Sequence, residues 1–151
     1  MADDRGPAGE PGSRGASDAS GPAPLLILAH GDSWERRFQV TSLAASAAAA
    51  GQPVEIALFF RALAAWAGNR WDLPEPDPPV TLDRLDALDL PPLTSMLAPG
   101  RERGLVRLYA CSASTRILGL GAATVQEAVD AVVGWPTFHR MIRRAERVVT
   151  L

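Results

Sequence analysis

The chain contains a single cysteine, Cys111, and two histidines, His30 and His139. A lone thiol excludes a dithiol redox cycle within one chain and leaves single-sulfur chemistry, either a persulfide or mixed-disulfide carrier or an acyl-transfer nucleophile. Amide N–H groups at the start of a helix after Cys111, with a nearby guanidinium, would favour its thiolate. The residues predicted to hold the anionic sulfur are Ser112, Ala113, Ser114 and Arg116. The alternative is that Cys111 is a small, buried core residue.

His30 is the second candidate catalytic residue, because it directly follows the apolar run 25–29. If the strands that end at His30 and Cys111 are neighbours, the imidazole stabilises the thiolate. The alternative is a turn histidine that bonds local backbone. Asp32 is read first as a helix cap and only second as a residue that orients His30. The turn predicted to line the same site consists of Gly31, Asp32 and Ser33.

Several function classes are excluded by composition. All 15 basic residues are arginine, which rules out a lysine Schiff base and a Walker-type lysine. A formal charge of −2 argues against autonomous binding of nucleic acid. The run Gly119-Leu120-Gly121 lacks the third glycine of a dinucleotide motif, and the few His and Cys residues are too scattered for a metal site, so we expect no cofactor and no metal.

The location is predicted from the same sequence features. No run of 18 apolar residues is present, so we expect no membrane-spanning helix. The first 24 residues contain Asp3, Asp4 and Glu10 and lack the apolar core of a secretory signal. We therefore expect a cytoplasmic protein.

The pattern of apolar residues predicts a disordered extension at 1–24 followed by one domain at 25–151. The predicted strands are 25–29, 54–60, 105–110 and 147–151. The predicted helices are 34–50, 61–67, 81–90, 125–132 after a capping box at Thr124 and Glu127, and 138–145 after a Thr137 cap. A further turn is expected at 93–98. The four tryptophans are expected to pack at the edge of the core, or to line an interface or cleft.

Strands that alternate with helices predict an α/β fold: a single-domain three-layer sandwich with a parallel sheet of four to five strands and helices on both faces. The favoured strand order is 2-1-3-4, because the long connection after the second strand gives the chain room to return past the first. The crevice of such a sheet lies where the winding reverses, between the first and third strands. The segments 30–33 and 111–114 would flank it.

Four stretches together resemble the DsrE/DsrF-like family, which includes TusD-type sulfurtransferase subunits. They are Leu25–Gly51, Val54–Phe60, Leu108–Ser114 and Ala145–Leu151. The resemblance implies a small α/β protein that assembles as a trimer or hexamer and accepts sulfane sulfur as a persulfide on a cysteine after the third or fourth strand. Cys111 inherits that role, with sulfur-donor and sulfur-acceptor proteins as partners.

Two other functions stay open beside this persulfide sulfurtransferase. One is a non-catalytic oligomeric binding or regulatory module on the same fold, in which Cys111 fills the core and the crevice holds a small ligand or peptide. The other is a cysteine hydrolase, which would need an oriented base.

Overall fold

The computed structural model describes residues 21–75 and 80–151. Most of the extension predicted at 1–24 lies outside the described residues. The first strand starts at Leu25, and just before it the Pro24 carbonyl accepts a hydrogen bond of 2.9 Å from the Glu146 N–H.

The core of the fold is one parallel sheet of five strands in the order β4-β3-β2-β1-β5. The strands are β1 (Leu25–Ala29), β2 (Val54–Leu58), β3 (Val106–Cys111), β4 (Ala131–Val133) and β5 (Arg147–Thr150). Every residue of β2 is buried, as expected for a parallel strand covered on both faces. The α/β sandwich predicted from the sequence is confirmed.

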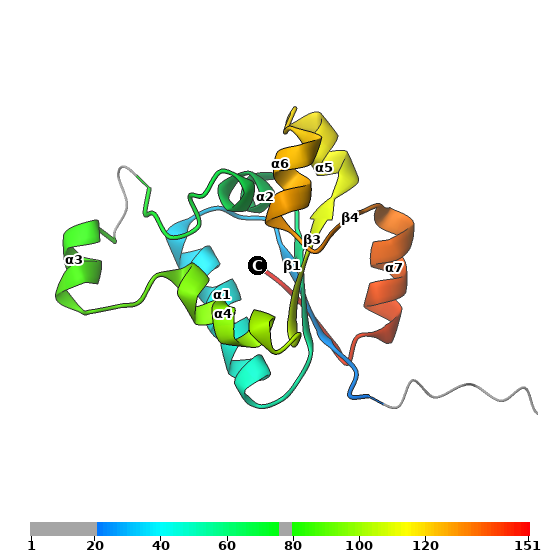
Figure 1. Cartoon of the computed structure of the whole chain (residues 1–151), viewed down its shortest axis with the longest axis horizontal. Helices are drawn as coiled ribbons and strands as arrows, with labels where there is room; N and C mark the ends of the chain where they lie inside the picture. The colour runs from blue at the N-terminus through cyan, green and yellow to red at the C-terminus, as the bar shows by residue number, and fades with distance from the viewer. Residues whose placement is uncertain (1–20, 76–79) are drawn as a thin grey trace, which may run out of the picture.

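Helices cover the two faces of the sheet unequally. They are α1 (Trp34–Ala49), α2 (Phe60–Ala67), α3 (Leu82–Ala87), α4 (Leu93–Glu102), α5 (Ser112–Ile117), α6 (Ala122–Ala128) and α7 (Trp135–Arg144). Figure 1 shows α1, α2 and α4 on one side of the sheet and α7 on the other. Residues of α1, α2, α4 and α6 join the larger apolar core, whereas in the described part of the chain the opposite face receives buried side chains from α7 alone.

The predicted strand order 2-1-3-4 is wrong, because β2 rather than β1 is the neighbour of β3. The long connection between β2 and β3 is occupied by α2, α3 and α4, and the chain advances by only one strand. Successive right-handed crossovers then carry the chain from β1 to β4 in one direction. Helix α7 returns along the other face and places β5 beside β1, so the winding reverses between β1 and β5.

Residues 129–132 were predicted as the end of a helix, but the short strand β4 begins within this segment, at Ala131. Asp130 pulls this segment into the sheet: its N–H donates to the Leu108 carbonyl at 2.9 Å, and its carboxylate accepts from the Leu108 N–H at 2.7 Å. These bonds outweigh the helical spacing of the apolar residues. The predicted caps are also wrong, since α6 begins after Gly121 rather than Thr124, and α7 begins after Gly134 rather than Thr137.

Helix α7 is held by one short apolar stripe. Phe138 and Met141, three residues apart on the same helix face, are buried against the sheet together with Leu26, Ala57 and Phe59. The opposite face of α7 is charged.

No helix within the described residues has both the length and the apolar character required to cross a membrane.

We predict that Phe138→Ala lowers the free energy of unfolding by about 3–5 kcal/mol, because the ring is fully buried where α7 meets the sheet. Chemical denaturation measures this loss. The neighbouring exposed substitution His139→Ala is the control and should stay within about 0.5 kcal/mol of the parent. Equal, small effects of both substitutions would contradict the docking of α7 described above.

Candidate functional site at the carboxyl edge of the sheet

Cys111 is the last residue of β3 and directly precedes α5, as predicted. Its side chain is only 2% exposed and lies in the apolar cluster that contains Phe59, Phe138 and Met141. The Thr115 hydroxyl donates a hydrogen bond of 3.0 Å to the Cys111 carbonyl, which fixes the first turn of α5. The thiol is therefore well placed at the edge of the sheet, but it is covered.

His30 lies at the same edge but is not paired with Cys111. The corrected strand order puts β2 between the strands that end at these residues, and no hydrogen bond joins the two side chains in the described part of the structure. The His30 ring instead stacks on Phe59, with ring centroids 4.7 Å apart and an interplanar angle of 14°. Burial lowers the pKa of His30, which favours the neutral imidazole and removes the positive charge that would stabilise a thiolate.

An aromatic group around Phe59 forms the cover of the cysteine. Phe59 contacts His30, Trp135 at 5.4 Å and Phe138 at 4.9 Å between ring centroids. Trp135 is 54% exposed and packs on the outside of the two buried phenylalanines. Phe59 was not predicted as a site residue, although its position at the end of a buried strand was a usable signal.

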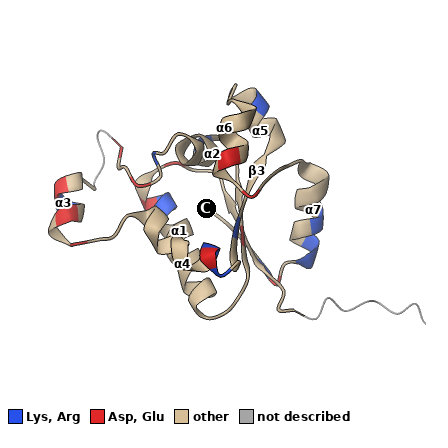
Figure 2. Ribbon diagram, viewed as in Figure 1, with Lys and Arg blue, Asp and Glu red and all other residues tan. Residues whose placement is uncertain are grey.

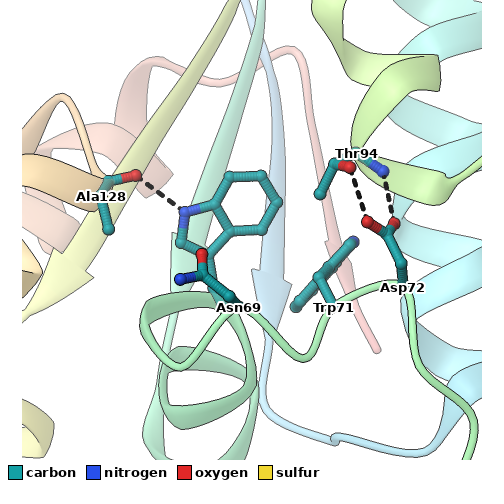
Figure 3. A pocket seen from close by; sticks show the side chains of 6 residues that line it. Asn69, Trp71, Asp72, Thr94 and Ala128 are labelled. Atoms are coloured by element: carbon teal, nitrogen blue, oxygen red, sulfur yellow. Dashed lines mark hydrogen bonds between the residues drawn. The ribbon is translucent and has the colours of Figure 1, made fainter.

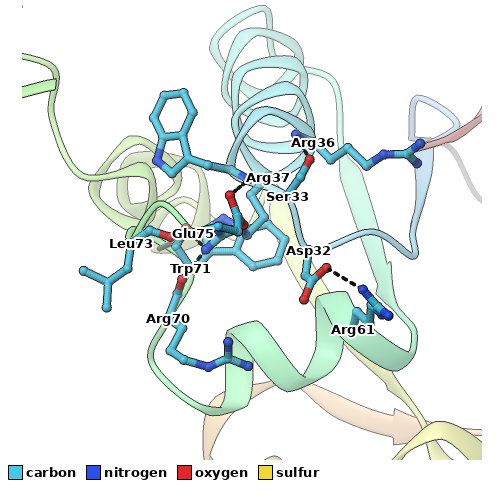
Figure 4. Close-up of polar contacts among 10 residues, drawn as sticks. Asp32, Ser33, Arg36, Arg37, Arg61, Arg70, Trp71, Leu73 and Glu75 are labelled. Carbon is cyan, nitrogen blue, oxygen red and sulfur yellow. Dashed lines mark hydrogen bonds and ion pairs between the residues drawn. The ribbon is translucent and has the colours of Figure 1, made fainter. Parts of the chain in front are cut away.

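In the turn after β1, Asp32 does not have the capping role that was predicted for it. Ser33, not Asp32, is the N-cap of α1, and its hydroxyl accepts a hydrogen bond of 3.4 Å from the Arg36 N–H. Asp32 lies opposite Arg61 of α2, 3.8 Å away (Figure 4). Asp32 therefore faces Arg61, and the geometry does not support a role for Asp32 in orienting His30. Gly31 completes the turn, partly buried beneath the side chain of Arg36.

The four residues predicted to hold an anionic sulfur differ in their exposure. Ala113 and Arg116 are exposed, and Ser112 is half-buried near Gly134. Ser114 is fully buried, and its hydroxyl has no hydrogen-bond partner among the described residues. Because α5 has only six residues, its dipole is small, and the buried hydroxyl is the more specific feature.

No protein-family model matches this chain, and no curated protein matches it significantly. The function must therefore be argued from the site itself.

Among the described residues, no group of three or more His, Cys, Asp or Glu side chains is arranged to hold a metal ion.

A buried arginine fixes the loop beside this edge. The Arg37 guanidinium donates to the backbone carbonyls of Arg70, Trp71 and Leu73 and forms an ion pair of 2.7 Å with Glu75 (Figure 4). The second carboxylate oxygen of Glu75 accepts from the Trp34 N–H at 3.0 Å. These contacts of Arg37 were not predicted from the sequence, because hydrogen bonds to backbone carbonyls leave no pattern of residue types.

A hollow of about 270 Å³ lies between Trp66, Asn69 and Trp71 (Figure 3). Its main polar groups are already used by the fold. The Trp66 indole N–H donates to the Ala128 carbonyl at 2.8 Å, and the Asp72 carboxylate accepts from both the N–H and the hydroxyl of Thr94 at 2.8 and 2.7 Å. This hollow is explained by packing and by the capping of α4.

We predict that Glu75→Gln destabilises the protein by about 0.5–1 kcal/mol at neutral pH, since the carboxylate is partly exposed. Burial raises the pKa of Glu75, but the hydrogen bonds from backbone N–H groups and the charge and hydrogen bond of Arg37 outweigh it and leave the pKa below its ordinary value of 4.5. The stabilisation is present above pH 4.5 and is lost as the pH falls through the lowered pKa.

Denaturation at a series of pH values tests this expectation. The difference between the parent and Glu75→Gln should vanish in acid, whereas the exposed control Glu127→Gln should show no difference at any pH. A Glu75→Gln deficit that persists unchanged in acid would be the contrary result.

We predict that Trp135→Ala increases the rate of Cys111 alkylation in the native protein by about tenfold, because it removes the outer layer over Phe59 and Phe138. Stopped-flow or mass-spectrometric labelling measures the rate. Phe60→Ala is the matched control, since Phe60 is also exposed at this edge but makes no ring contact with that pair in the described structure. Equal rates in the two variants would show that Trp135 does not limit access.

Proposed function

We propose that the protein is a sulfur carrier that accepts sulfane sulfur on Cys111 as a persulfide and passes it to a partner thiol. The observation that carries the proposal is the position of this thiol: it ends a strand at the carboxyl edge of a parallel sheet, one turn before a buried hydroxyl, that of Ser114, without a partner. The resemblance to the DsrE/DsrF-like family supports the same chemistry.

The transfer is an exchange in which no net oxidation occurs. The Cys111 thiolate attacks the outer sulfur of a donor persulfide, a new S–S bond forms, and the S–S bond of the donor breaks to release the donor thiolate. An acceptor thiolate then attacks the outer sulfur on Cys111, and the Cys111 thiolate leaves. The outer sulfur atom moves twice, and the carrier returns to its starting state.

The residues around Cys111 have separate parts in this exchange. The Ser114 hydroxyl donates a hydrogen bond to the anionic persulfide, with the N–H groups of the first turn of α5 as further donors. Trp135 moves away to admit the partner, and the apolar cluster then shields the persulfide from other thiols. His30 acts through its stacking on Phe59 rather than through charge.

The partners are donor and acceptor proteins in the cytoplasm, and the carrier assembles with copies of itself as a trimer or hexamer, as the family resemblance implies. Exposed apolar side chains near the edge offer a surface for docking, which transient protein interfaces use. They are Phe60, Ile117, Leu118 and Trp135.

The second candidate function is a non-catalytic binding or regulatory module, and one observation favours it. A cysteine that is 2% exposed and surrounded by apolar side chains is typical of an inert core residue. In that case the edge of the sheet binds a ligand or peptide through its aromatic residues, and the sulfur takes no part.

We predict that incubation of the native protein with a persulfide donor adds about 32 Da per sulfur atom, reversibly by reductant, and that Cys111→Ser shows no gain. Intact-mass spectrometry measures this. Ser114→Ala, which keeps the thiol, should load but lose its sulfur faster to a small thiol acceptor. If the wild-type protein gains mass only after unfolding, the sulfur-carrier proposal fails and the binding module remains.

A further inference from the structure

A buried carboxylate interrupts the most protected strand of the sheet. Glu55 occupies the second position of β2, where every other residue is apolar, and its side chain faces the α7 side beside Leu26. Only 6% of Glu55 is exposed. Because burial of an ionised group is costly unless it is well paired, a residue at this position calls for a specific partner.

Only one of the two carboxylate oxygens of Glu55 accepts hydrogen bonds from the described residues. Oε1 accepts from Arg144 Nη2 of α7 at 2.5 Å and from the Tyr109 hydroxyl of β3 at 3.5 Å. Oε2 is buried and has no hydrogen-bond partner among the described residues. Burial, and then the negative charge of Glu55, raise the pKa of Tyr109, so the phenol remains a donor. One strong acceptor is therefore left unused.

Glu55 lines an open cavity of about 360 Å³, which is within the usual size of small-molecule sites. The polar side chains in its wall are Glu55, Arg107, Tyr109 and Arg144. The segments just before β2 and β3 also line it, so it lies at the amino ends of the strands, opposite the end that carries Cys111. This site is therefore independent of the proposed sulfur chemistry.

The charges in the cavity favour an anion. Two guanidinium groups, of Arg107 and Arg144, outnumber the single carboxylate of Glu55 and leave one uncompensated positive charge. Figure 2 shows further basic residues along α7, whereas acidic residues lie on α3, at the opposite side of the molecule, and also on α4 and near α6. The basic residues of α7 add to the attraction of small anions toward this cavity.

We propose that this cavity binds a small monoanion that also carries its own O–H or N–H donor, as a 2-hydroxycarboxylate or dihydrogen phosphate does. The anionic group accepts hydrogen bonds from Arg107 and Arg144, and the donor of the ligand bonds to the unused oxygen of Glu55. The terminal torsion of glutamate is soft, so the carboxylate turns to give one oxygen to Arg144 and the other to the ligand. The ligand then neutralises the excess positive charge of the two arginines, and its donor occupies the unpaired oxygen of Glu55.

The experiment uses glycolate and acetate, which have the same charge and differ in the single hydroxyl donor, with inorganic phosphate as a third probe. Titrations followed by two-dimensional NMR report the affinities and locate them at the backbone amides of Glu55, Arg107 and Arg144. We expect glycolate to bind about tenfold more tightly than acetate, because a hydrogen bond to a charged acceptor contributes that much. A comparison of glycolate with phosphate then assigns the anionic group as carboxylate or phosphate.

Matched variants separate the two features of the site. Arg107→Gln, at an exposed position that leaves the core untouched, should weaken glycolate binding about fivefold, whereas the exposed Arg143→Gln, on the same helix as Arg144 but outside the cavity, should not. Glu55→Gln should strengthen acetate binding, because it removes a negative charge, and should reduce the preference for glycolate. The proposal is overturned if no probe shifts these amides, if glycolate and acetate bind equally, or if Arg107→Gln and Arg143→Gln bind alike.

Discussion

The whole arrangement depends on the return of α7 across one face of the sheet. Because β5 must reach the free side of β1, the chain crosses back over β3, β2 and β1, and Phe138 and Met141 are buried in that crossing. A single helix of ten residues cannot cover the face of five strands. Its first turn closes over Cys111 at the carboxyl edge, and its last turn supplies Arg144 to Glu55 near the amino edge.

The two ends of this face have opposite chemical character. At the carboxyl edge the sulfur lies among aromatic rings, where water and charge are excluded and His30 is favoured in its neutral form. At the amino edge the side chains are charged, and one acceptor of Glu55 is unsatisfied. On the other face, the terminal nitrogens of the Arg37 guanidinium bind backbone carbonyls and Glu75 and so hold the loop that contains Glu75. Glu55 differs because the residue with the unpaired oxygen also lines a cavity.

The sequence predicts the elements better than their arrangement. Apolar runs located four strands and most helices, because burial on both faces leaves a plain signal, but they carry no information on which strands are neighbours. Strand β4 was missed because three residues docked by Asp130 look like the end of a helix. The position of Cys111 where a strand gives way to a helix was predicted correctly from the apolar run before it. The stacking of His30 on Phe59 and the bonds of Arg37 were not, because they join segments through ring contacts and backbone carbonyls.

The pairing of β5 with β1 also determines the order in which the molecule can form. Leu25 lies opposite Arg147 in the register, so β1 and β5 are the two neighbouring strands that are furthest apart in the described sequence. During synthesis, β1 and β2 are available long before β5 emerges, and one edge of β1 then has no neighbouring strand. Parallel pairing over such a separation is slow, and an open strand edge attracts other chains. The edge of β1 therefore stays exposed until α7 has crossed the sheet and β5 pairs with β1.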